Sequence, residues 1–466
     1  MTRAPAERGD PVKPLTDLVE PEGGVPDGDV VRAPPAPATV DTRGGRLRAQ
    51  WSDHMLRATV FNVASAVVTS LLGFLYWTIA ARVTTTAAVG YTAAVMSLTT
   101  GVSLLTGLGV NSLIVQRLPT LERTPAWAAF VTTWLWWTAG ITAVVGALVG
   151  LGIHSRGRGL VPPVLAVVVV AVGATGLVVV MIVDRVFLAS RRTDLGLVLD
   201  ASLSAAKVLS LGALLLPGAA VTVMLLGWMG AVTITCGLAC VLLPRLGLGR
   251  IGRPVLALVG RRDLFAVFGH HLTSVGGLMT PYLLPPLVVY RLDASSNAYF
   301  YATWMVGSAF LIISPAISAS LFAEGARDVA TLALRTRRAF RMLAVLLPLP
   351  LAAGVLGGRW ILLIFGGEYA HHGYVLLAVL ALASVPDAIT NVAVAVLRVT
   401  GRLRFAAALN LAMGAVALVG AWTLLPHIGI LGAGLAWLAA QVLGCLFVAP
   451  LMVRSVRPAP QAVVVD

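Results

Sequence analysis

The sequence predicts an all-α, polytopic membrane protein with about 12 transmembrane helices in two pseudo-repeated six-helix lobes. Of its 466 residues, 58% are hydrophobic and only 12% are charged, whereas soluble proteins carry about 25% charged residues. Apolar runs of about 20 residues recur along the chain, which is enough to cross a bilayer at about 1.5 Å per residue. Arginines also gather in alternate loops, as the positive-inside rule predicts.

The predicted organisation places two lobes between polar segments. The first 50 residues are rich in Pro, Gly and mixed charge, a composition that cannot bury a core. The segments are a disordered cytoplasmic tail at 1–50, an N-terminal six-helix lobe at 57–244, a cytoplasmic linker at 245–263, a C-terminal six-helix lobe at 264–455 and a cytoplasmic tail at 456–466. The predicted spans lie at 57–81, 87–115, 126–151, 161–183, 195–216, 219–244, 264–290, 297–321, 339–365, 373–397, 404–425 and 429–453, with a break in the ninth at Gly357-Gly358.

The charge distribution predicts the orientation. With the N-terminal tail in the cytoplasm, twenty arginines fall in inner loops or the C-terminal tail and five in outer loops. Both termini are therefore expected on the cytoplasmic side, and the net charge of +14 needs no nucleic-acid partner. The three cysteines, Cys236, Cys240 and Cys445, lie in apolar segments and do not indicate a disulfide framework or a metal site.

Two pairs of segments indicate an internal repeat. The stretch ARVTTTAAVGYTAA resembles VYRLDASSNAYFYAT, with Arg82 matching Arg291 at an offset of 209 residues. Later, RRTDLGLVLD resembles GRLRFAAALN, with Arg192 matching Arg402 at an offset of 210 residues. Six helices per copy keep the same orientation in the membrane, so the repeat axis runs along the membrane normal and a substrate path is expected between the lobes.

The first span carries a polar stripe along one helix face. The stripe consists of Asn62, Ser65, Thr69, Gly73 and Tyr76. It has two interpretations, a helix–helix seam or the wall of a water-filled cavity.

Lys207 is the sharpest candidate site residue, because it lies deep inside an apolar span. It shares a helix face with Asp200 and Ser204. A cation at membrane depth is costly unless it is paired or hydrated. Lys207 is therefore predicted to be either a cavity cation that attracts an anionic head group or a member of a structural pair with Asp200, Asp387 or a carboxylate of another segment.

Asp387 is the second candidate. It shares a face with Ser384 and Asn391, beside Pro386, which interrupts the helical hydrogen bonding. The carboxylate is open to three interpretations: a ligand for a proton or sodium ion, a partner for Lys207, or an acceptor for sugar hydroxyls.

Three further candidates lie near span ends. His270 lies six residues into a proline-rich seventh span, where it either titrates or binds a phosphate in a cavity or sits at the interface. Arg82 and Arg291 end the first and seventh spans at equivalent outer positions, where they either snorkel or rim an outward vestibule. His371 and His372 have no supporting ligand cluster, so no metal site is expected.

The stretches GFLYWTIAARVTTTAAVGYTAAVMSL, GLGVNSLIVQRLP and ILLIFGGEYAHHGYVLLAVLAL, in this order and spacing, resemble polysaccharide-type flippases of the MOP exporter superfamily. This Wzx-like group includes O-antigen, teichoic-acid and exopolysaccharide export proteins. The resemblance implies the MOP flippase fold and translocation of undecaprenyl-pyrophosphate-linked oligosaccharide across the bacterial cytoplasmic membrane by alternating access. It implies a cationic central cavity and a role in polysaccharide or lipopolysaccharide biosynthesis. The implied partners are the lipid-linked oligosaccharide, membrane lipids and a polysaccharide polymerase or glycosyltransferases.

Two alternatives stay open. A multidrug or cation antiporter of the same superfamily is expected to have an acidic residue in the first span; that span has none, although Asp387 could substitute. An integral-membrane glycosyltransferase or polysaccharide polymerase is expected to carry an acidic motif in an outer loop, where only Asp293 and Glu368 occur. No enzymatic chemistry and no cofactor are expected apart from H⁺ or Na⁺ as a coupling ion, and GGVPDGD lacks the features of a nucleotide-binding loop.

Overall fold

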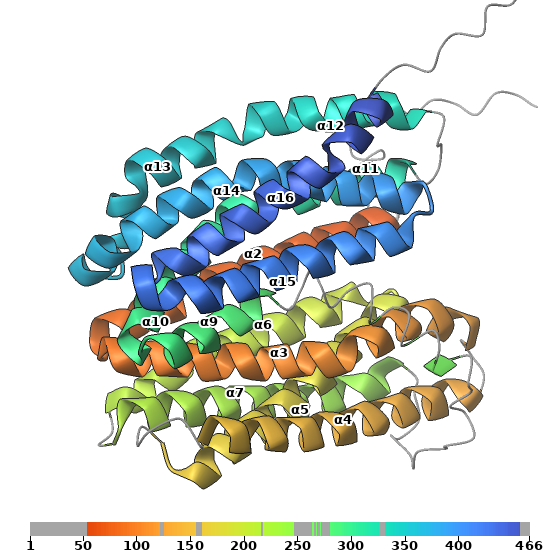
Figure 1. The fold of residues 1–466 in the computed structure, drawn as a ribbon. Helices are drawn as coiled ribbons and strands as arrows, with labels where there is room; N and C mark the ends of the chain where they lie inside the picture. The colour runs from red at the N-terminus through yellow and green to blue at the C-terminus, as the bar shows by residue number, and fades with distance from the viewer. Residues whose placement is uncertain are drawn as a thin grey trace, which may run out of the picture. The chain divides into compact units, whose positions relative to one another are not determined.

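The computed structural model describes residues 54–121, 125–154, 161–215, 218–246, 263–264, 267, 271, 280–325 and 331–456. Within these residues every regular element is helical, so the predicted all-α class is confirmed (Figure 1). The α-helices of the N-terminal half are α2 (His54–Val83), α3 (Thr86–Arg117), α4 (Pro125–His154), α5 (Pro163–Ala189), α6 (Thr193–Ser210) and α7 (Ala220–Leu242). Those of the C-terminal half are α9 (Thr280–Arg291), α10 (Ala294–Leu311), α11 (Ile313–Gly325), α12 (Leu332–Leu346), α13 (Pro348–Leu362), α14 (Gly367–Val399), α15 (Leu403–Ile428) and α16 (Leu431–Val456).

Eleven helices in the described part of the chain are long and apolar enough to cross a membrane. They correspond to all the predicted spans except the seventh. Of that span, predicted at 264–290, the structure describes α9 and a few preceding positions. The chain is thus a multi-pass membrane protein, and the twelfth crossing stays a prediction.

The break in the ninth predicted span was placed wrongly. The helix continues through Gly357 and Gly358 and is interrupted instead at Leu347, between α12 and α13. Pro348 opens α13, where its missing N–H costs no helical hydrogen bond. Gly358 has a packing role, since an added Cβ would lie 3.0 Å from the Leu377 side chain on α14.

Small residues let neighbouring helices approach closely in the N-terminal half. Helices α4 and α5 pack side by side along their length (Figure 1). A Cβ added at Gly146 would lie 2.9 Å from the Cα of Ala171, and one at Gly150 would lie 2.6 Å from the Cα of Val167. Two glycines four residues apart form the small-residue pattern that allows two membrane helices to pack closely. Inside a membrane this van der Waals packing, and not the hydrophobic effect, stabilises the helix pair.

Helix α3 connects the two halves, because it packs against α9 and α10 as well as against α5. Gly90 lies directly against the backbone of Ala294 and Ala298, leaving no space for a Cβ. The Asn297 amide donates to the Gly90 carbonyl at 2.7 Å, and the Thr86 hydroxyl donates to the Ser295 hydroxyl at 3.2 Å. These contacts hold the N-terminal ends of α3 and α10 together.

The turns after α5 and α14 have the same backbone geometry at an offset of 210 residues. The backbone N–H of Arg192 donates to the Phe187 carbonyl at 2.8 Å, and the backbone N–H of Arg402 donates to the Leu397 carbonyl at 2.8 Å. The residue before each arginine is left-handed, Arg191 with φ 59° and Gly401 with φ 72°. Both turns are Schellman motifs, so the sequence offset of 210 corresponds to a repeated structural element.

Candidate functional site

Lys207 lies on α6 beside two aromatic rings of α2. It is fourteen residues after the helix start, or about 21 Å along the axis, and is partly buried. Its Nζ lies 4.3 Å from the centre of the Tyr76 ring and 5.3 Å from that of Trp77. Aromatic faces stabilise a cation without neutralising it.

Neither carboxylate predicted as a structural partner pairs with Lys207. Asp200 accepts a hydrogen bond from the Ser65 hydroxyl of α2, and Asp387 belongs to a separate cluster on α14. No ion pair with Lys207 is recorded anywhere in the described part of the chain. The ammonium group is therefore a cation inside an apolar span. Its neighbours are aromatic, and no described carboxylate forms an ion pair with it.

The aromatic neighbours continue into the C-terminal half. The ring of Tyr301 on α10 lies 4.8 Å from that of Trp77. Tyr76 is fully buried and packs edge-on against Trp77 at 5.0 Å. We call Tyr76, Trp77 and Tyr301 the aromatic cluster; with Lys207 it joins α6 and α2 to α10.

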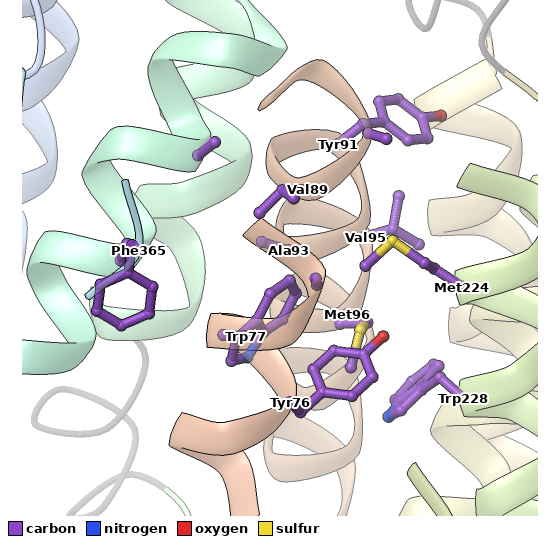
Figure 2. Close-up of a cluster of buried hydrophobic side chains, with 14 of the residues drawn as sticks. Tyr76, Trp77, Val89, Tyr91, Ala93, Val95, Met96, Met224, Trp228 and Phe365 are labelled. Atoms are coloured by element: carbon purple, nitrogen blue, oxygen red, sulfur yellow. The ribbon is translucent and has the colours of Figure 1, made fainter. Parts of the chain in front are cut away.

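The surroundings of the aromatic cluster are apolar. Figure 2 shows Tyr76 and Trp77 next to Met96, with Trp228 of α7 on one side and Phe365 of the C-terminal half on the other. The Tyr76 hydroxyl is buried and has no hydrogen-bond partner among the residues that the structure describes. A hydroxyl in this state is an available donor for a polar group that reaches it.

The predicted polar stripe of α2 is divided by the structure. Ser65 and Tyr76 are buried, and Ser65 contacts α6 through Asp200. Asn62 is exposed. The part of the stripe that meets α6 is thus a helix–helix seam.

A second carboxylate lies near Asp200 and was not predicted. Asp184 of α5 is 3.2 Å from Arg185 and interacts electrostatically with Asp200. A Cβ added at Gly196 of α6 would lie 2.6 Å from Asp184 Oδ1, so this glycine makes room for the carboxylate. The signal in the sequence was an Asp-Arg pair inside the apolar run VVVMIVDRVFLA.

Asp387 forms a hydrogen-bonded cluster in the C-terminal half. The residue is 7% exposed. It accepts from the Ser314 hydroxyl of α11 and from the Asn391 amide at 3.0 Å. The same amide donates to Ser314 at 3.2 Å, which closes a three-membered network.

This network borders a cavity of about 560 Å³ between helices of the C-terminal half. Thr390 donates to Gln441 of α16 at 2.9 Å on the same wall. Asn410 and Arg398 also line the cavity. Amide, hydroxyl and guanidinium groups around one carboxylate make a polar cavity inside an apolar bundle.

Two lining residues were missed although the sequence held a signal for each. Arg398 lies on the same face of α14 as Asp387 and Asn391, eleven and seven residues further along. Gln441 is the one polar side chain in the apolar run LAWLAAQVLGCLF. Helical periodicity applied to these spans would have found both.

The remaining predicted residues lie apart from these clusters. The Arg82 guanidinium donates to the carbonyl oxygens of Ile364 at 3.0 Å and Leu363 at 2.6 Å. The Arg291 guanidinium lies 4.6 Å from the ring centre of Trp422. His270 lies outside the described residues.

No protein-family model and no curated protein sequence matches this chain. Solved structures do. An inward-facing multidrug resistance MATE family transporter of the MOP superfamily is 15% identical over 85% of this chain and 95% of its own, with a TM-score of 0.62. The lipid II flippase MurJ, in an inward closed conformation, is 10% identical over 85% of this chain and 90% of its own, with a TM-score of 0.68.

A MOP superfamily transporter from Pyrococcus furiosus is 15% identical over 89% of this chain and 99% of its own, with a TM-score of 0.59. These three structures span nearly the whole helical part of the chain. The protein therefore has the fold of MOP superfamily transporters.

Proposed function

We propose that this protein is a flippase that moves undecaprenyl-pyrophosphate-linked oligosaccharide across the bacterial cytoplasmic membrane by alternating access of its two halves. The observation that carries the proposal is Lys207, a cation inside an apolar span with aromatic rings beside it and no ion-paired carboxylate among the described residues. A pyrophosphate in hydrocarbon is costly, because an isolated charge loses its hydration there. A positive group at membrane depth lowers that cost for an anionic head group.

The groups around Lys207 suit the rest of such a substrate. Aromatic rings such as Tyr76 and Trp77 offer apolar faces, and the Tyr76 hydroxyl has no partner within the described ranges of the chain. The aromatic cluster also reaches from the N-terminal to the C-terminal half through Tyr301. A ligand held there would touch both moving halves, which alternating access requires.

The fold is compatible with this proposal, since one of the similar structures is a lipid II flippase. It is equally compatible with export of other substrates, because other similar structures are multidrug transporters. The polymerase or glycosyltransferase partners implied by the sequence resemblance belong to the same proposal.

A second candidate function is a cation-coupled multidrug antiporter. The observation that favours it is Asp387, a buried carboxylate at the wall of a polar cavity of about 560 Å³. A carboxylate in this position is a candidate ligand for H⁺ or Na⁺. In the flippase reading the same group serves as the coupling site for the ion gradient.

The deciding experiment follows a fluorescent polyprenyl-pyrophosphate oligosaccharide between the leaflets of reconstituted vesicles. Wild type, Lys207→Arg and Lys207→Met are compared, with a cationic dye assayed in parallel. We expect flipping by wild type, substantial flipping by Lys207→Arg and a loss of at least about tenfold in Lys207→Met, because the midplane charge is gone. Dye export driven by a proton gradient, with no movement of the lipid-linked sugar, would contradict the flippase and support the antiporter.

A further inference from the structure

A basic pocket lies between α11 and α12, on a different face of α11 from the cavity beside Asp387. It has a volume of about 170 Å³. Its polar lining comes from Ser320 and Glu324 of α11 and from Arg335 and Arg338 of α12. The cavity beside Asp387 uses Ser318 and Phe322 of α11 instead. The two hollows are therefore separate sites.

The charges of the pocket do not cancel. Arg335 pairs with Glu324 at 2.6 Å and also donates to the Thr331 hydroxyl at 2.7 Å. Arg338 is exposed, and no ion pair or hydrogen bond is recorded for it in the described part of the chain. One guanidinium is thus already neutralised while the second offers its charge to a ligand.

The position along the span places the pocket at head-group level. The predicted crossing Leu332–Leu362 has 31 residues. At 1.5 Å per residue it is about 46 Å long, whereas the hydrocarbon core is about 30 Å thick. Arg335 and Arg338 lie in the first two turns of this crossing, near the boundary between its core and the head groups.

The surface beside the pocket is apolar on the side that enters the membrane. Met342 and Val345 follow Arg338 on the same face of α12, four and seven residues further along, and both are exposed. Met342 also lines the pocket. A guanidinium at head-group level above an exposed apolar stripe matches a phosphate group that carries acyl chains, and it does not match a free ion.

We infer that this pocket binds the phosphate head group of an anionic phospholipid whose acyl chains lie along α12. Basic pockets between transmembrane helices are a recognised way of holding such lipids. Glu324 limits the affinity, because its carboxylate competes with the phosphate for Arg335. This inference is independent of the transported substrate.

The test measures lipid retention on the purified full-length protein by native mass spectrometry, with phosphatidylglycerol and phosphatidylcholine of the same chains. Wild type is expected to retain phosphatidylglycerol preferentially. Arg338→Gln should weaken this retention about fivefold, the effect of one basic group near a charged lipid. Arg338→Lys should keep most of it, and Glu324→Gln should strengthen it. Arg404→Gln, which removes an exposed arginine at the start of α15, is the matched control and should leave retention unchanged.

Four results would overturn the inference. One is equal retention of the two lipids by wild type. Another is an equal loss with Arg338→Gln and Arg404→Gln, which would indicate general surface charge. A third is displacement of phosphatidylglycerol by millimolar inorganic phosphate, which would indicate a soluble anion site. A last one is Arg338→Gln weakening the retention of polyprenyl pyrophosphate but not of phosphatidylglycerol, which would assign the pocket to the transported lipid.

Discussion

The Arg82 side chain at the end of α2 donates from Nε to the carbonyl oxygen of Ile364, 282 residues later, at 3.0 Å. Its Nη2 donates to the neighbouring Leu363 carbonyl at 2.6 Å. These carbonyls follow the C-terminal end of α13, where unpaired acceptors and the helix dipole favour a cation. A side chain of the N-terminal half thus caps a helix of the C-terminal half, on the side predicted to face outward.

Arg82→Ala is expected to favour opening between the halves on that side. The substitution removes two hydrogen bonds in an exposed position, a loss of about 1 kcal/mol that shifts a two-state equilibrium about fivefold. Maleimide labelling of a cysteine placed at Ser295 should become faster by about this factor, in a background without the three native cysteines. Arg359→Ala, at an exposed arginine of α13, is the control and should not change the labelling rate. Equal rates in all three proteins would show that the Arg82 contacts do not influence opening.

A disulfide between the ends of α3 and α10 should block transport. Thr86 and Ser295 are within 3.2 Å through their hydroxyls, so Thr86→Cys with Ser295→Cys should oxidise readily. Alternating access requires these ends to separate, so we expect flipping to stop on oxidation and to return with a reductant. Flipping at the normal rate with the bond fully formed would mean that this contact persists throughout the cycle.

Asp387→Asn is expected to uncouple transport from an ion gradient. The amide keeps the size of the side chain and its contacts with Ser314 and Asn391, but it removes the charge that would hold a cation. The flipping rate should then be the same with and without an imposed proton or sodium gradient. Thr390→Val removes a neighbouring polar group of the same cavity and should keep the gradient dependence. A gradient response in Asp387→Asn equal to that of wild type would exclude this residue as the coupling site.

Arg191→Gly is expected to stabilise the protein. Arg191 has a φ of 59°, which costs a side chain with a Cβ about 1 kcal/mol. Its counterpart Gly401 has a φ of 72° without that cost. The thermal midpoint in detergent should rise for Arg191→Gly, stay unchanged for Arg191→Ala and fall for Gly401→Ala. A fall for Arg191→Gly would mean that the arginine makes a compensating interaction.

Hydropathy and charge were sufficient to predict the helical class and eleven of the spans, because a bilayer imposes length and polarity on every crossing. The break at Leu347 was not predicted, since glycine was taken as the weaker point. In the structure Gly358 packs against Leu377 while Pro348 begins a new helix. Single-sequence patterns do not tell a flexible glycine from a closely packed one.

The sequence was sufficient to predict which residues belong to the candidate site, but not which side chains they contact. Lys207 and Asp387 stand out because a charge inside an apolar run is rare. That Trp77 lies beside Lys207, and Tyr301 beside Trp77, depends on which helices become neighbours, and aromatic residues are common in apolar spans. The absence of an ion pair between Asp200 and Lys207 also depends on helix packing, because the Asp200 carboxylate accepts a hydrogen bond from Ser65 on another helix.

The hydroxyl pair of Thr86 and Ser295 is separated by 209 residues, which is the offset that relates Arg82 to Arg291 in the repeat. Equivalent positions touch each other only where a two-fold axis passes between them. If each half were a separate chain and two identical copies formed a dimer, the residue at the position of Thr86 and Ser295 would contact the same residue of the other copy. Only a group that both donates and accepts can satisfy itself in this way, whereas a carboxylate or an ammonium would repel its twin. The same predicted offset pairs Ala88 with Asn297, which differ in chemistry, whereas the position on the axis carries a hydroxyl in each half.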